Sequence, residues 1–339
     1  MKKYNIGLIG TGLQSHRRLP SIQNNTFCNI AKIAGINRTE TELLCKEYEA
    51  QPIFNWQDIV NDKNIDIIVI CTPPDLHYEI AYQALKHKKH VLCEKPLTRS
   101  SVDAQKLILI AKKENVVLKC GFNHRHHPAM LAAYDILKKG EIGIPFTGRA
   151  VYGICGREGC EKEWRSSPSI VSGGQLMEQG IHCVDLFRWY MGSFESVSAN
   201  VATKVFPITP LEDTATILLH SKNNDCATIH SSITQWRNKF HLEIYGTQGY
   251  FEIIGLGGSY ELQQLKIGKR APDKPFSEQV IDFRGRDKSW DNEWNHFIDI
   301  IRNESTQLLG SGEDGVNAMK IIESAYNAAE IKQRVLINE

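Results

Sequence analysis

The chain has 339 residues, with 40 basic and 39 acidic side chains and a formal net charge of +1. This length predicts two domains with ample material for a core. Because charges of both signs are mixed along the chain, nucleic acid and lipid surfaces are excluded as electrostatic partners. A small-molecule partner is predicted instead.

The cysteines and the apolar segments indicate the compartment. Nine cysteines form no CxxC pair, so we expect reduced, mostly buried thiols and no metal site. No apolar segment approaches the roughly 18 residues of a membrane span. The first residues lead into a strand without the hydrophobic region of a signal peptide. We therefore predict a cytoplasmic protein that does not bind membranes.

The first third of the chain alternates β-rich runs with amphipathic segments. Strands are predicted at 4–9, 31–36, 65–71, 90–93 and 116–121. Helices are predicted at 40–49, 75–87 and 101–114, the first two with Thr39 and Asp75 as N-caps. This alternation is typical of βαβ units, so residues 1–122 are predicted to form a domain with a parallel sheet.

Residues 123–339 predict a second domain of different architecture. A helix at 128–139 and a Gly-rich middle precede β-type runs, which lie at 196–205, 214–220, 227–234 and 240–254. Two helices follow, at 290–302 and 312–334. Because short turns join the runs, this α+β domain is predicted to contain a large, open, mostly antiparallel sheet.

The stretch GLIGTGLQSH, residues 7–16, follows the first strand. In a dinucleotide-binding turn, one glycine makes the bend, a second admits the pyrophosphate and a third packs the helix on the strand. Gly10 and Gly12 take the first two positions, Ser15 takes the third, and Leu13 opens the helix whose N-terminus would face the phosphates. The alternative is a plain strand-to-helix turn.

The residues after the second strand bear on the choice of cofactor. An acid about 20 residues beyond the glycine turn usually binds the ribose hydroxyls of NAD. This chain instead has Asn37, 25 residues past Gly12, followed by Arg38. Asn37 can bond both hydroxyls and Arg38 can stack on adenine, but the missing carboxylate also admits a 2′-phosphate. NAD and NADP remain alternatives.

Two later turns of the first domain follow strands at the edge where parallel sheets bind ligands. One reads CTPPDLH and contains Thr72, Pro73 and His77; the other reads CEKPL and contains Glu94 and Lys95. We predict that all five residues line the cofactor. Lys95 is either a solvated charge or a group that orients a substrate hydroxyl and lowers the pKa of a neighbouring base.

The segment GGQLMEQGIHCVDLFRWYMG, residues 173–192, is predicted to form one helix. Spacings of four, three and four place Glu178, His182, Asp185 and Trp189 on one stripe, and the other faces are apolar. A histidine four residues from a carboxylate suits a general base. The alternative is that this stripe faces water.

The motifs GLIGTG, CTPPDLH, EKPL and GG…ExGxHxxD occur in one order, together with GFNHRHHP at 121–128 and DGVNAMKIIESAYNAA at 314–329. Together they resemble the glucose-fructose oxidoreductase/inositol dehydrogenase (Gfo/Idh/MocA) family of NAD(P)-dependent oxidoreductases, over nearly the whole chain. The resemblance implies a Rossmann domain, followed by a substrate-binding and oligomerisation domain whose open sheet joins the subunits of a homodimer or homotetramer.

The resemblance also implies an active site in the cleft, with Lys95, Glu178 and His182 as its catalytic group. The family acid is commonly aspartate, so Glu178 is longer by one methylene. In the expected reaction His182 takes the proton of a substrate hydroxyl, Lys95 stabilises the developing alkoxide, and the carbon passes hydride to the nicotinamide.

Residues that suit a carbohydrate lie mainly in the second domain. An indole face suits the C–H face of a sugar ring, and an arginine suits a phosphate or a carboxylate. The candidates are Asn123, Arg125, Trp164, Arg165, Asp185 and Trp236. The acid-free run 124–127 is not predicted to bind a metal, and its imidazoles are expected to be partly exposed.

The expected substrate is a sugar, a sugar nucleotide or a cyclitol. The segments GGSY and QWRN are similar to those of relatives thought to act in the biosynthesis of surface sugars. Two other functions remain open. One is a glycoside hydrolase of the same fold that uses NAD as a transient oxidant; the other is a regulatory dinucleotide-binding protein without catalysis.

Overall fold

The computed structural model describes residues 3–275 and 277–337, and the chain folds into two compact units. The first unit consists of residues 1–123 and 289–316, and the second of residues 124–288 and 317–339. Residues 289–316, which the sequence prediction assigned to the second domain, therefore belong to the first unit. No helix within the described residues is long and apolar enough to cross a membrane.

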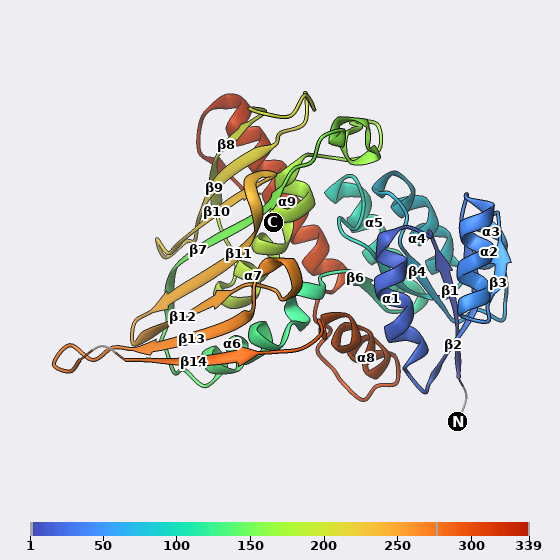
Figure 1. Cartoon of the computed structure of the whole chain (residues 1–339), viewed down its shortest axis with the longest axis horizontal. Coiled ribbons are helices and arrows are strands. Elements are labelled where there is room, and N and C mark those ends of the chain that lie inside the picture. Colours follow the sequence, from blue (N-terminus) through green and yellow to red (C-terminus); the bar gives the residue numbers. More distant parts are fainter. Residues whose placement is uncertain (1–2, 276, 338–339) are drawn as a thin grey trace. The chain divides into compact units, whose positions relative to one another are not determined.

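The first unit contains a six-stranded parallel sheet in the order β3-β2-β1-β4-β5-β6 (Figure 1). In chain order its strands are Tyr4–Ile9, Cys28–Ala34, Gln51–Ile53, Ile67–Ile70, His90–Cys93 and Leu118–Cys120. The predicted parallel sheet is confirmed. The strand order reverses between β1 and β4, and ligands of such sheets bind at the carboxyl ends of the strands beside this reversal.

Helices follow most of these strands, and two N-cap predictions are wrong. The helices are α1 (Leu13–Gln23), α2 (Arg38–Glu47), α3 (Gln57–Val60), α4 (His77–Lys86) and α5 (Ser101–Glu114). Asn37, in place of Thr39, caps α2, because its backbone is extended and its side chain accepts the Glu40 N–H. Asp75 lies inside a 3₁₀ turn, Pro74–Leu76, which precedes α4.

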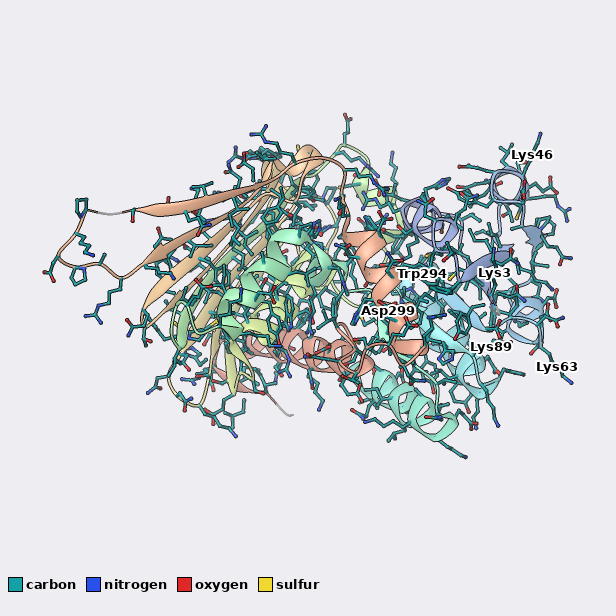
Figure 2. All side chains as sticks on the ribbon, turned by 90° about the horizontal axis from the view of Figure 1, so that it is seen from below. Lys3, Lys46, Lys63, Lys89, Trp294 and Asp299 are labelled. Carbon is teal, nitrogen blue, oxygen red and sulfur yellow. The ribbon has the colours of Figure 1, made fainter. Side chains whose placement is uncertain are left out.

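Helix α8 (Ser289–Ile301) completes the core of the first unit. Trp294, on α8 in Figure 2, packs with Phe297 and Ile298 into one buried cluster with Ile6 and Leu8 of β1. Burial of each such side chain contributes roughly 1.5–3 kcal/mol. This apolar face explains why a segment so late in the chain belongs to the first unit.

The second unit contains a nine-stranded sheet in the order β14-β13-β12-β11-β7-β10-β9-β8-β15 (Figure 1). In chain order its strands are Pro145–Cys155, Ser196–Ala202, Thr214–His220, Cys226–Ser232, Thr234–Gly246, Gly249–Ile254, Gln263–Lys269, Glu278–Phe283 and Val335–Leu336. Among the described strands of this second sheet, only β7 and β10 pair in parallel, so the predicted mostly antiparallel sheet is confirmed. The predicted run 240–254 forms the hairpin β11–β12, and the strands β7, β13, β14 and β15 were not predicted.

The helices of the second unit pack on this sheet. Helix α7 (Ile181–Met191) contacts β7 and β10, and α6 (Pro128–Lys138) contacts β12 and β13. Helix α9 (Gly312–Ile331) ends in this unit. A π-helical turn, Leu176–Gly180, precedes α7, so the prediction of one regular helix over 173–192 is corrected: its first part has wider turns.

Candidate active site

The glycine turn joins β1 to α1. Gly10 has a left-handed backbone with φ of 103°, and a Cβ there would lie 2.6 Å from the Cys71 carbonyl oxygen. A side chain is therefore excluded at this bend. The Ser15 hydroxyl donates to the Gly10 carbonyl at 2.6 Å, so the serine at the third motif position stabilises the turn.

Gly12 differs from Gly10: its backbone conformation is open to any residue, and the space beside its Cα is empty. Its φ is −76°, and no atom lies within 4 Å of a Cβ built on it. Gly12 is the N-cap of α1, whose first N–H groups receive no side-chain cap, and Leu13 is exposed beside it. An open approach to uncapped N–H groups fits the pyrophosphate of a dinucleotide.

The residues expected near the adenosine are placed as follows. The Asn37 side chain accepts the Glu40 N–H at 3.2 Å, and the Arg38 guanidinium stacks 4.0 Å above the Phe54 ring. The Thr11 hydroxyl donates to the Glu40 carboxylate at 3.5 Å. Glu40 thus brings to the glycine turn a carboxylate that was not among the predicted site residues. The signal in the sequence was the position of Glu40 in the first turn of α2, the helix that follows β2.

His77 connects the turns that follow β4 and β5. Its buried ring lies 2.8 Å from the Pro96 carbonyl oxygen through Nδ1 and 2.9 Å from the Thr72 carbonyl oxygen through Nε2. Burial lowers the pKa of His77, although the two carbonyls oppose this. The His77 ring thus holds these two turns together, and its cofactor contact stays a prediction. Thr72 and Pro73 remain predicted cofactor residues.

Glu94 is also occupied within the protein. Its carboxylate pairs with the Arg18 guanidinium at 2.6 Å, Arg18 pairs with Glu293 at 2.8 Å, and Lys119 lies 3.4 Å from Glu293. All four side chains are buried. Glu94 therefore belongs to a network of buried charges beneath the turn, and the half-buried Lys95 follows it directly. The cofactor contact of Glu94 stays a prediction.

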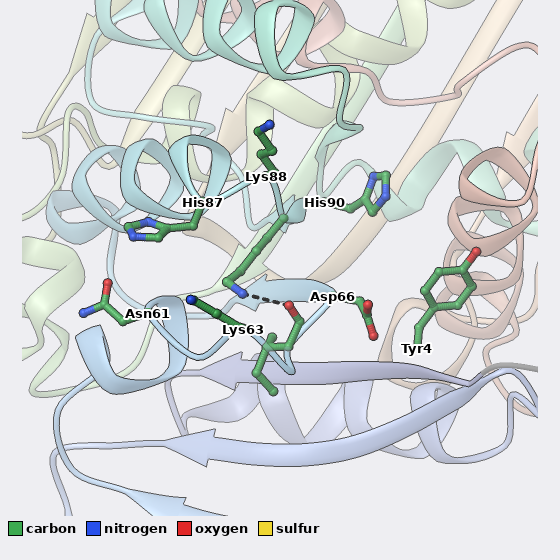
Figure 3. Close-up of a pocket in the computed structure, with 9 residues that line it drawn as sticks. Tyr4, Asn61, Lys63, Asp66, His87, Lys88 and His90 are labelled. Atoms are coloured by element: carbon green, nitrogen blue, oxygen red, sulfur yellow. Dashed lines mark hydrogen bonds between the residues drawn. The ribbon is translucent and has the colours of Figure 1, made fainter.

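The pocket drawn in Figure 3 lies at the opposite edge of the first sheet. Tyr4, Asp66 and His90 line it, at the amino ends of β1, β4 and β5. The Lys89 ammonium donates to the Ile65 carbonyl at 2.7 Å, the bond dashed in Figure 3. Because parallel sheets bind ligands at the carboxyl ends of their strands, this pocket does not belong to the candidate site.

The middle of the motif stripe in the second unit is buried. His182 is 4% exposed and Asp185 1%, so these two residues do not face water, whereas Glu178 and Trp189 at its ends are partly exposed. The His182 ring stacks on the His124 ring, with centroids 3.9 Å apart and an angle of 23° between the rings. His124 was not among the predicted site residues, because a histidine-rich run resembles an exposed polar segment.

Arg125 and Asp185 bind each other. Arg125 donates from Nε at 2.7 Å and from Nη2 at 2.6 Å to the two carboxylate oxygens. Such buried, bidentate pairs are satisfied internally. The substrate contacts predicted for both residues stay predictions. The pair also holds the turn that carries His124 next to α7.

One further expectation around this turn, the partial exposure of its imidazoles, is corrected, whereas the substrate contact of Asn123 stays a prediction. The four imidazole and guanidinium side chains of residues 124–127 are all buried: the rings of His124 and His127 meet at 5.5 Å, and Arg125 pairs with Asp185. Asn123 donates from Nδ2 to the Ser289 hydroxyl at 3.1 Å, so its amide is engaged within the first unit. Within residues 3–275 and 277–337, no cluster of three or more His, Cys, Asp or Glu side chains is arranged to hold a metal.

Glu178 lies on the π-helical turn, and its carboxylate is 3.4 Å from Nε of Arg165. The start of this turn is held by Glu212, which accepts the N–H groups of Gly174 and Leu176 and the Tyr326 hydroxyl. Burial raises the pKa of Glu212. Glu178 therefore approaches Arg165, which was predicted to bind the substrate. The turn that carries Glu178 is held by a second carboxylate, that of Glu212.

The two predicted tryptophans lie near one apolar cluster, formed by Val171, Ile208, Leu211 and Ile233: Trp164 directly, and Trp236 through Phe206, with ring centroids 6.4 Å apart. Trp164 packs against this cluster and lies under the Arg165 guanidinium, 4.2 Å from its ring centroid. Trp236 is 63% exposed and has a left-handed φ of 56° in the irregular part of β11. An exposed indole held in this backbone conformation remains a candidate surface for a sugar ring.

A glycine turn on a six-stranded parallel sheet, with a second unit that buries a histidine, defines a dinucleotide-binding α/β protein. Residues 4–122 match the model described as "Oxidoreductase family, NAD-binding Rossmann fold", and residues 130–252 match the "GFO/IDH/MocA C-terminal domain". The chain belongs to the Gfo/Idh/MocA family and is an NAD-binding oxidoreductase. The family resemblance inferred from the motifs is confirmed.

Individual relatives agree with this assignment. Levoglucosan dehydrogenase of Pseudarthrobacter phenanthrenivorans is 32% identical over 160 residues, which are 47% of this chain and 41% of that protein. The uncharacterized oxidoreductase YrbE of Bacillus subtilis is 28% identical over 95% of this chain and 93% of its own. A solved levoglucosan dehydrogenase in complex with NADH and levoglucosan shares the fold, with a TM-score of 0.89, 22% identity and complete coverage of both chains.

Proposed function

We propose that this oxidoreductase transfers a hydride between NAD(P) and a hydroxyl or keto carbon of a sugar, a sugar nucleotide or a cyclitol. The observation that carries the proposal is the buried His182 ring on the motif helix. An enclosed imidazole suits proton exchange with a substrate hydroxyl. Similarity to levoglucosan dehydrogenase supports a carbohydrate substrate, and the GGSY and QWRN segments favour surface-sugar biosynthesis.

In this proposal neutral His182 accepts the hydroxyl proton, and the Lys95 ammonium donates a hydrogen bond to the oxygen that becomes negative. A bound nicotinamide supplies the hydride acceptor, or the donor in the reverse direction. Gly10, Gly12 and Leu13 are proposed to hold its pyrophosphate. The open space at Gly12 and the uncapped start of α1 support this assignment.

Glu178 and its partner Arg165 are proposed to bind the substrate and not to transfer the proton. The carboxylate orients the Arg165 guanidinium, which then offers a charge to a phosphate, a carboxylate or a hydroxyl of the sugar. Trp236 is proposed as the stacking surface. We also propose a homodimer or homotetramer joined through the open sheet. Buried and accessible residues alternate along β9, so one face of this strand is covered and the other is the face proposed to meet a second subunit.

The direct test measures absorbance at 340 nm with NAD⁺ or NADP⁺ and a panel of sugars, sugar nucleotides and cyclitols. The expected result is net cofactor reduction with at least one class. Sugar release without net reduced cofactor would replace the proposal with the hydrolase. Cofactor binding by thermal shift, without turnover of any member or of its keto form, would favour a regulatory protein.

We further infer a preference for NAD over NADP, carried by Glu40. Its carboxylate at the Thr11 hydroxyl would repel a 2′-phosphate near the glycine turn. We expect Glu40→Gln to raise kcat/KM with NADP⁺ relative to NAD⁺ by about fivefold to tenfold, which corresponds to removal of one like charge. Glu47→Gln, at the far end of α2, is the matched control, and an unchanged cofactor ratio in Glu40→Gln would contradict the inference.

A further inference from the structure

We propose that His124 is a positioning residue for the proton acceptor His182: it fixes the acceptor's ring by stacking and takes up a proton in its place as the pH falls. The proposal rests on the proposed function, because it assumes that His182 exchanges a proton with the substrate. Nothing in the motif pattern assigns a role to His124.

The geometry of the two rings carries the first part. Their centroids are 3.9 Å apart at 23°, and both rings are at most 5% exposed. His124 also meets the rings of His127, Tyr152 and Phe240 at centroid distances of 5.5, 5.3 and 5.9 Å. Rings on several sides leave His124 little freedom to rotate, so the surface on which His182 lies is rigid.

The chemistry of stacked imidazoles carries the second part. Two protons on rings this close, away from water, would place two like charges face to face, so the pair accepts its first proton as a unit. Whenever that proton is on His124, the His182 ring stays neutral. His182 therefore remains able to accept a substrate proton at a lower pH than a lone histidine in the same place.

The groups around the pair come from several elements. Tyr152 of β7 stays protonated, because burial and Tyr260, on a neighbouring turn, raise its pKa. Burial lowers the pKa of His127 against the opposing effect of Asp287, which lies 3.6 Å from it. Ser231 of β10 is uncharged and lies near the start of α7.

Charged and weakly acidic groups on or beside α7 complete this environment. Burial raises the pKa of the Cys183 thiol, so the thiol is neutral. Glu178 is paired with Arg165, and Asp185 is paired with Arg125. Each of these carboxylates has a cationic partner, and the buried imidazole of His126 belongs to the same run as His124. Imidazole is the side chain whose unperturbed pKa lies near neutral pH.

The test uses His124→Phe, which keeps an aromatic ring in the stack and removes its titration. NMR titration of imidazole-labelled protein, with His182→Asn to assign the signal, should show the His182 pKa raised by about one unit in the variant. His124→Gln provides a second non-titrating side chain if the phenylalanine variant does not fold. His87→Phe, an exposed histidine of the first unit, is the control.

An unchanged or lowered His182 pKa in the folded variants would overturn the proposal, whatever the activity. The pH profile of kcat/KM tests the underlying function separately. If His182 is the proton acceptor, the acid limb of the kcat/KM profile moves to higher pH in His124→Phe, together with the His182 pKa measured by NMR. A raised pKa with an unmoved acid limb would uphold the coupling of the rings but remove His182 from catalysis, and with it the role proposed here for His124.

Discussion

Lys95→Met should lower kcat by about 100-fold to 10,000-fold while the protein stays folded and binds its cofactor. Methionine keeps much of the length and the apolar stem of lysine but lacks its ammonium group. The variant would therefore lose the hydrogen bond and the charge that stabilise the developing alkoxide. Because a transition-state interaction is removed, kcat and kcat/KM should fall together. Steady-state kinetics at 340 nm measure both values.

The control for this prediction is Lys63→Met, which removes the same charge from the first unit at the Figure 3 pocket. It should leave kcat within about twofold, because surface charges far from a reacting atom are screened. Calorimetric titration with NAD⁺ checks that Lys95→Met binds cofactor. A kcat for Lys95→Met within threefold of the unchanged protein would contradict the catalytic role of Lys95.

Local patterns in the sequence predicted most of the first sheet. The bounds of β1, β5 and α5 agree with the predicted ranges, because hydrophobic runs bounded by turns depend only on neighbouring residues. The cap of α2 was misassigned because Asn37 and Thr39 are both capable N-caps. Backbone conformation, which a single sequence does not display, selects between them.

Helix periodicity was a weaker guide to the motif helix. A regular spacing of 3.6 residues placed Glu178 and His182 on one stripe, but the π-helical turn at Leu176–Gly180 widens the spacing there. Its start is fixed by Glu212, 34 residues after Glu178. Local propensity cannot anticipate a turn whose start is held by a distant carboxylate.

The buried charges were missed for the same physical reason. Arg125 and Asp185 are 60 residues apart, and Arg18 and Glu293 are 275 apart. In the sequence each looks like a solvated surface residue, since charged side chains are almost never fully buried unless paired. Only the fold brings the compensating partner: Arg125 pairs with Asp185, and Glu94 pairs with Arg18.

Glu293→Leu should destabilise the protein by about 3–5 kcal/mol, the usual cost of breaking a buried ion pair from one side. Leucine fills much of the space of the fully buried Glu293 but accepts no hydrogen bond. Arg18 would lose the second of its two carboxylate partners, at 2.8 Å, and the Lys119 ammonium would lose the carboxylate 3.4 Å away. Chemical denaturation followed by circular dichroism measures the loss.

A double variant tests whether charge, and not packing, causes this loss. Glu94, Arg18, Glu293 and Lys119 together carry no net charge, so Glu293→Leu leaves one buried positive charge, which Lys119→Met removes. Lys119→Met/Glu293→Leu should therefore be destabilised by less than the sum of the two single variants. Glu304→Leu, on the surface, should cost at most about 1 kcal/mol. If the losses from Lys119→Met and Glu293→Leu were strictly additive, the four side chains would not form one network of charges. The turn at Glu94, next to Lys95, would then be held by packing alone.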